Sequence, residues 1–124
     1  MGQTLAIAAG GALGALLRFW GSNWVYSLLG KGFPYGTLAV NVAGSLAMGV
    51  CYIWLVERTT LAPEWRALVM VGFLGAFTTF STFSIETVNL LEGGAFYKAL
   101  LNILMSVTLC VAAAWLGMAV GRQL

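Results

Sequence analysis

Four long apolar runs, separated by short loops, constrain how this chain of 124 residues can fold. The runs cover approximately residues 5–29, 35–56, 67–91 and 99–120. Each run reaches the ~20 residues that a helix needs to cross a bilayer. The chain is only 8% charged, whereas soluble domains carry about 25% charged residues. The sequence therefore predicts an all-α integral membrane protein, with four transmembrane helices in a single domain over residues 1–124.

The composition also argues against several classes of function. The chain has no histidine and no Asp, and it lacks a Ser–His pair and a phosphate-binding loop, so we expect no enzyme. Cys51 and Cys110 stand alone inside apolar runs, where a free cysteine behaves as a small apolar residue. The net charge of +2 is too small and scattered for a nucleic-acid surface. No Lys or Arg precedes the first run, so we expect no cleaved signal peptide.

The third run contains a segment that is a poor transmembrane helix. Every residue from Thr78 to Ser84 is Ser, Thr or Phe, and Gly72 and Gly75 precede this segment. Ser and Thr side chains bond nearby backbone groups in competition with a helix. Irregular backbone at membrane depth is tolerated only where it is buried in protein or lines a polar cavity. We therefore predict that the third helix is broken at mid-membrane, where ion or substrate sites often form.

Two other runs carry polar residues every four positions, which places them on one helical face. They are Thr37, Asn41 and Ser45 in the second run, and Asn102, Ser106 and Cys110 in the fourth. An amide in hydrocarbon is costly unless it finds a partner. These stripes therefore either line a polar pathway or bond neighbouring helices. Two GxxxG pairs, Gly10 with Gly14 and Gly117 with Gly121, predict close helix contacts.

Two charged residues, Arg18 and Glu86, lie inside the predicted spans. Arg18 either extends towards the interface beside Trp20 and Trp24, or places a positive charge in a water-filled vestibule that attracts anions. Glu86 is the only acid inside a span, and intramembrane carboxylates are functional candidates by default. Because it lies near the end of its span, an interfacial or structural role is the alternative.

A single carboxylate is a poor basis for a cation pathway, which needs acidic rings or relays. The amides and hydroxyls of the stripes instead suit an anion that accepts hydrogen bonds. Phe80 and Phe83 lie three residues apart, and the positive edges of their rings can contact an anion; ordinary packing is the alternative. Carbonyls from Gly75 to Thr78, freed by a break, could hold a cation.

The loops carry almost no charge asymmetry. The side that holds both termini has Arg58, Arg66 and Arg122, while the other side has Lys31 and Lys98, together with Arg18 if it points that way. Because the excess of Lys and Arg sets membrane orientation, this near balance permits insertion in both directions. Two opposite copies would form an antiparallel dimer with the inverted-repeat architecture of larger transporters.

The chain resembles the Fluc fluoride channels over essentially its whole length. The motifs that carry the resemblance are Gly-Ala-Leu-Leu-Arg-Phe ending at Phe19, Gly-Thr-Leu-Ala-Val-Asn-Val-Ala-Gly at 36–44, and the 15 residues from Gly72 to Glu86. The resemblance implies a dual-topology homodimer in the cell inner (plasma) membrane, with two fluoride pathways and a central sodium ion that is structural and not transported.

The resemblance also implies roles for individual residues. The implied fluoride pathway comprises Asn41, Phe80, Phe83, Thr82, Asn102 and Ser106. Thr37, Ser81, Glu86 and Arg18 are further candidate pathway residues, and Arg18 matches the first-helix arginine of the family without an assigned role. Cys110, a weak donor, extends the track on the fourth helix. The implied sodium ligands are the carbonyls of Gly75 and Thr78, doubled by the dimer axis.

The predicted function is thus a fluoride-selective channel that exports fluoride passively and so relieves fluoride toxicity. The alternative is a small proton-coupled multidrug-resistance-type transporter, which also has four spans and dual topology. Such a transporter needs a carboxylate in its first helix, and residues 5–29 contain none. A third interpretation is an assembly subunit that conducts no ion alone.

Overall fold

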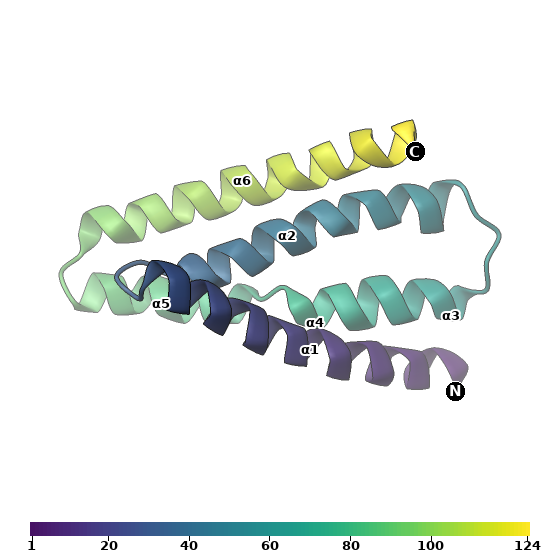
Figure 1. The fold of residues 1–124 in the computed structure, drawn as a ribbon, viewed down its shortest axis with the longest axis horizontal. Coiled ribbons are helices and arrows are strands. Elements are labelled where there is room, and N and C mark those ends of the chain that lie inside the picture. Colours follow the sequence, from purple (N-terminus) through teal and green to yellow (C-terminus); the bar gives the residue numbers. More distant parts are fainter.

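The computed structural model describes all residues 1–124 and contains helices and loops but no strand. Four helical spans are long and apolar enough to cross a membrane: Gly2–Leu29, Tyr35–Glu57, Pro63–Glu92 and Phe96–Gln123. The prediction of a four-span, all-helical protein is therefore confirmed. Figure 1 shows an elongated bundle with its loops at the two ends and both termini at the same end.

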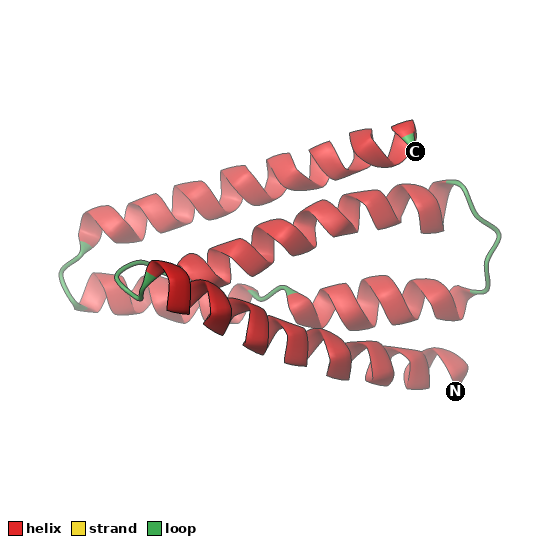
Figure 2. Cartoon of the chain, in the orientation of Figure 1, coloured by secondary structure: helices red, strands yellow, loops and turns green.

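Eight helical elements make up the four spans. Figure 2 shows the helices and the loops that join them. In chain order the elements are α1 (Gly2–Leu29), α2 (Tyr35–Tyr52), η1 (Ile53–Glu57), α3 (Pro63–Arg66), η2 (Ala67–Leu74), α4 (Gly75–Phe77), α5 (Phe80–Glu92) and α6 (Phe96–Gln123). The elements η1 and η2 are π-helical turns that continue α2 and α3 without a gap. The third span thus consists of α3, η2, α4 and α5.

The helices extend a few residues beyond the apolar runs. The third span begins at Pro63, because proline lacks an N–H and fits the first turn of a helix. The fourth begins at Phe96, and Phe96 and Tyr97 are exposed. Aromatic residues at helix ends are typical of the membrane–water interface.

Pairs of helices approach each other closely where glycines lie. A Cβ on Gly10 or Gly14 of α1 would collide with the backbone of η2, at Leu68 and Phe73. A Cβ on Gly117 of α6 would collide with the Leu46 carbonyl oxygen of α2. Small residues permit such backbone contact between membrane helices. The GxxxG pairs therefore join α1 to η2 and α6 to α2.

We expect Gly117→Val to destabilise the fold, because the added side chain meets backbone atoms that cannot rotate away. Overpacking of this kind typically costs about 1–3 kcal/mol. The midpoint of thermal unfolding in detergent should fall. Gly32→Ala is the matched control, because a Cβ on Gly32 meets nothing within 4 Å. An unchanged midpoint for Gly117→Val would contradict the close α2–α6 contact.

Candidate functional site

Two extended residues separate α4 from α5. The backbone of Thr78 has φ −88° and ψ 159°, and that of Thr79 has φ −152° and ψ 123°. Figure 2 shows this stretch as a loop between two helical segments. Extended residues inside a helical span remove several main-chain hydrogen bonds, so the groups they free need other partners.

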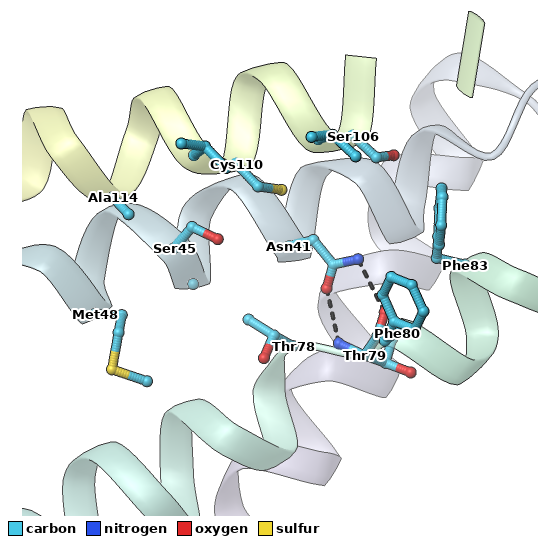
Figure 3. Close-up of a pocket in the computed structure, with 13 residues that line it drawn as sticks. Asn41, Ser45, Met48, Thr78, Thr79, Phe80, Phe83, Ser106, Cys110 and Ala114 are labelled. Atoms are coloured by element: carbon cyan, nitrogen blue, oxygen red, sulfur yellow. Dashed lines mark hydrogen bonds between the residues drawn. The ribbon is translucent and has the colours of Figure 1, made fainter. Parts of the chain in front are cut away.

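Asn41 of α2 bonds both backbone groups of Thr79 (Figure 3). Its Nδ2 donates to the Thr79 carbonyl oxygen at 3.0 Å. The Thr79 N–H donates to Oδ1 of Asn41 at 2.7 Å. The side-chain amide thereby replaces the helical partners that the extended residues have lost. One N–H and one lone pair of the amide remain available.

The side chain of Thr79 begins α5. The N–H of Thr82 donates to Oγ1 of Thr79 at 3.1 Å, the bond expected of a threonine at the N-cap of a helix. The Thr79 hydroxyl in turn donates to Oγ1 of Thr82 at 3.1 Å. Ser81 is exposed and lies 3.3 Å from the same hydroxyl. Thr82 and Ser81 therefore belong to the cap of α5.

Several carbonyls before α5 lose the donors that they would have in a continuous helix, among them those of Gly75 and Thr78. The carbonyl of Gly75 would accept from the Thr79 N–H, which instead bonds Asn41. That of Thr78 would accept from the Thr82 N–H, which instead bonds the Thr79 side chain. These are the two carbonyls that the resemblance assigns to sodium.

The intervening carbonyl of Ala76 has an external partner. Nε of Arg18, on α1, donates to it at 2.9 Å. A cation is favourable at the C-terminal end of a helix, where the carbonyl dipoles point. Arg18 is half-buried, and its guanidinium thus bonds the end of α4 instead of facing the cavity described next.

A cavity of about 380 Å³ lies beside the extended residues (Figure 3). Its lining residues are Asn41, Gly44, Ser45, Met48, Thr78, Thr79, Phe80, Phe83, Ser106, Val107, Cys110, Val111 and Ala114. The lining combines α2, α5 and α6 with the extended residues, and it contains no charged side chain. Among the predicted site residues, it brings together Asn41, Thr78, Phe80, Phe83 and Ser106.

The two phenylalanines lie in different environments. Their ring centroids are 5.3 Å apart and the ring planes meet at 45°. Phe83 is 9% exposed, whereas Phe80 is 77% exposed. Phe83 thus forms part of the packed wall of the cavity. Phe80 stands at its open side, where this chain alone does not cover the ring.

Asn102, the first polar residue of the stripe on the fourth span, is buried against α5. Asn102 is 2% exposed, and its Nδ2 donates to the Thr87 hydroxyl at 3.0 Å. Its Oδ1 accepts from Ser106 at 3.4 Å. Asn102 thus joins α6 to α5 and does not line the cavity, while Ser106 connects Asn102 to it.

Glu86 lines a second cavity, and Thr37 contacts Tyr26, another residue of its wall. This cavity also measures about 380 Å³ and is lined by Asn23, Tyr26, Lys31, Gly32, Phe33, Pro34, Glu86, Asn89 and Leu90. The Tyr26 hydroxyl donates to Oε2 of Glu86 at 2.8 Å and lies 3.4 Å from the Thr37 hydroxyl. Oε1 of Glu86 is buried without a hydrogen-bond partner in the chain.

Sequence reasoning missed several residues of these two cavities, three of which are informative. Thr79, Met48 and Tyr26 lie on the cavity walls but were not among the predicted site residues. Thr79 lies inside the hydroxyl-rich segment, whose composition could have indicated that Thr79 belongs to the site. Tyr26 lies on the aromatic end of the first run and carries no pattern that distinguishes it from an interfacial tyrosine.

Comparisons with known proteins agree with one another. The family described as "CrcB-like protein, Camphor Resistance (CrcB)" matches residues 5–118. Three relatives bear the name fluoride-specific ion channel FluC. The one from Methylococcus capsulatus (strain Bath) is 57% identical over 119 residues, which cover 96% of this chain and 52% of the relative. This chain thus spans about half the length of that relative.

The other two relatives match over nearly their full length. The one from Coxiella burnetii (strain Dugway 5J108-111) is 52% identical over 123 residues, which cover 98% of this chain and 99% of the relative. The one from Geobacter sulfurreducens is 48% identical over 124 residues and all of both chains. These relatives are named as ion channels, which supports the expectation that the chain is not an enzyme. Together with the four spans, the matches show that this chain belongs to the CrcB-like family of membrane proteins.

Proposed function

We propose that this chain is a fluoride-selective channel through which fluoride leaves the cytoplasm passively. The observation that carries the proposal is the uncharged lining of the first cavity, which combines an amide, hydroxyl groups and two aromatic rings. The names of the relatives support it. A multidrug transporter receives no comparable support, because Glu86, the only acid inside the four apolar runs, lies at the second cavity.

The chemistry of the lining suits a small, strongly hydrated anion. A pathway must replace the water around fluoride with other donors, yet it must release the ion at the far end. Asn41 retains one N–H, and the Ser45 hydroxyl lies on the same cavity. The Ser106 hydroxyl also lies there, but it donates its proton to Asn102. Ring edges of Phe80 and Phe83 carry partial positive charge. None of these groups is a full cation that would trap the anion.

The membrane potential supplies the driving force in this proposal. One elementary charge gains about 2.3 kcal/mol per 100 mV of potential. Because the cell interior is negative, an anion moves outward without ATP or a coupled ion. The protein would therefore work in the cell inner (plasma) membrane and relieve fluoride toxicity there.

The working unit in this proposal is an antiparallel homodimer with the break of the third helix at mid-membrane. Its support is the near-equal distribution of Lys and Arg between the two sides and the exposure of Phe80. Because Phe80 is 77% exposed at the open side of the cavity, a second copy could complete the wall. Two pathways would result, one from each cavity.

A sodium ion held by main-chain carbonyls fits the residues between α4 and α5. The carbonyls of Gly75 and Thr78 have lost their helical donors, as the bonds of Thr79 and Thr82 require. No group of three or more His, Cys, Asp or Glu residues is present, and oxygen ligands suit a hard cation. In the dimer, the ion would fix the two interruptions to each other without being transported.

We expect the purified protein to release fluoride from liposomes far faster than protein-free liposomes do, because the cavity supplies hydrogen-bond donors within the apolar barrier. A fluoride electrode measures the efflux. Chloride-loaded liposomes provide the selectivity control, and a proton-driven dye-export assay tests the transporter alternative. Fluoride release at the protein-free rate would refute channel function. Chloride release of similar size would refute selectivity.

We expect Phe83→Ile to slow fluoride efflux by about tenfold, equivalent to about 1.4 kcal/mol in the barrier. Isoleucine keeps the apolar bulk and removes the ring edge. Phe80→Ile should act in the same direction. Phe96→Ile is the matched control, because Phe96 is exposed on α6 outside the cavity. If correctly assembled Phe80→Ile and Phe83→Ile proteins release fluoride at the wild-type rate, neither ring contributes to the pathway.

We expect sodium to raise the midpoint of thermal unfolding relative to potassium or choline at equal ionic strength. A ligand at 100 times its Kd stabilises the folded state by about 2.7 kcal/mol, which corresponds to a shift of several degrees. Scans at one heating rate in chloride salts of the three cations measure it. Identical midpoints would argue that no specific sodium site exists.

A further inference from the structure

We infer that Asn41 is a positioning residue, which sets the start of α5 by holding the backbone of Thr79. This inference deepens the proposed fluoride pathway and rests on it. It assigns to the asparagine a task other than direct contact with the ion.

Two hydrogen bonds with Asn41 hold the backbone of Thr79. Asn41 accepts from the Thr79 N–H at 2.7 Å and donates to the Thr79 carbonyl oxygen at 3.0 Å (Figure 3). A residue bonded at both its N–H and its carbonyl cannot rotate about its neighbours without breaking one bond. Asn41 thereby fixes the extended conformation of Thr79, with no help from the helical ladder.

The surface of α2 beside Asn41 also leaves space for the end of α4. A Cβ on Gly44 would collide with Cγ2 of Thr78 and would lie 3.1 Å from the Phe77 ring. Gly44 therefore leaves room for the end of α4, three residues along the chain from the asparagine. One short segment of α2 thus both accommodates the extended residues and bonds them.

The N-cap residue Thr79 sets the direction of α5. The Thr79 side chain accepts from the N–H of Thr82, so the direction of the first helical turn follows from the placement of Thr79. Phe80 begins that turn and Phe83 completes it. Asn41 therefore determines, through Thr79, where both rings stand at the cavity.

The test separates positioning from ion contact. Protein labelled with 15N-threonine in detergent micelles reports amide exchange at Thr79, and Thr87 inside α5 serves as internal reference. Asn41→Ala should speed exchange at Thr79 at least about fivefold, as expected from losing one hydrogen bond. It should leave Thr87 unchanged and reduce fluoride efflux by about tenfold, because small misplacements are costly in a preorganised site.

Two variants complete the test. Ser45→Ala removes a hydroxyl from the same cavity and the same stripe but breaks no bond to Thr79, so exchange at Thr79 should stay at the wild-type rate. Asn41→Asp has nearly the same shape and keeps an acceptor for the Thr79 N–H, although it loses the donor to the Thr79 carbonyl. Exchange at Thr79 should therefore rise by less than about fivefold in that variant, even if Asn41→Ala fails to fold.

Three results would overturn the inference. One is unchanged Thr79 exchange in folded Asn41→Ala, with or without slowed efflux. Another is equal acceleration in Ser45→Ala, and the third is acceleration of about fivefold or more in Asn41→Asp. The exchange measurement needs no transport. A wild-type protein that moves no fluoride would therefore refute the proposed function without deciding the role of Asn41.

Discussion

The pairing of Asn41 with the backbone of Thr79 is the interaction on which the rest of the site depends. A bilayer core offers no water to main-chain groups that leave a helix, so each such group needs a partner from the protein. Asn41 serves two groups of Thr79, and Arg18 serves the carbonyl of Ala76. With these partners, two extended residues can persist inside an otherwise helical span, and the chain gains an uncharged cavity beside them, with several polar groups on its wall.

The polar residues on one face of α2 have different structural roles. Thr37, Asn41 and Ser45 are spaced identically, yet each meets a different environment. Thr37 lies near the Tyr26 hydroxyl, Asn41 bonds Thr79, and Ser45 lines the first cavity. The fourth span divides in the same way, because Asn102 joins two helices while Ser106 reaches the cavity wall. A four-residue spacing therefore predicts a shared direction, but the facing helix determines the role.

The sequence predicted the four spans because apolar length is a strong signal, and the glycine pairs were placed correctly at close helix contacts. The hydroxyl-rich segment was recognisable as weak helix, but its composition is too uniform to indicate that Thr78 and Thr79 are the extended residues. The partners of Arg18 and Glu86 could not be found either, since both depend on residues 58 and 60 positions away. The dimer, the sodium ion and the depth of the interruption stay predictions.

The positions of Arg18 and Glu86 bear on why a pathway with so few charges could serve an anion. Both residues lie within the spans, yet neither lines the first cavity. The guanidinium bonds a helix end, and the carboxylate accepts from Tyr26. A full positive charge on the wall would hold an anion in a medium of low dielectric, where charge interactions are strong. A full negative charge would exclude it. With both charges outside the lining, amide, hydroxyl and ring dipoles set the local field, and such dipoles can be strong enough to replace water while still permitting release.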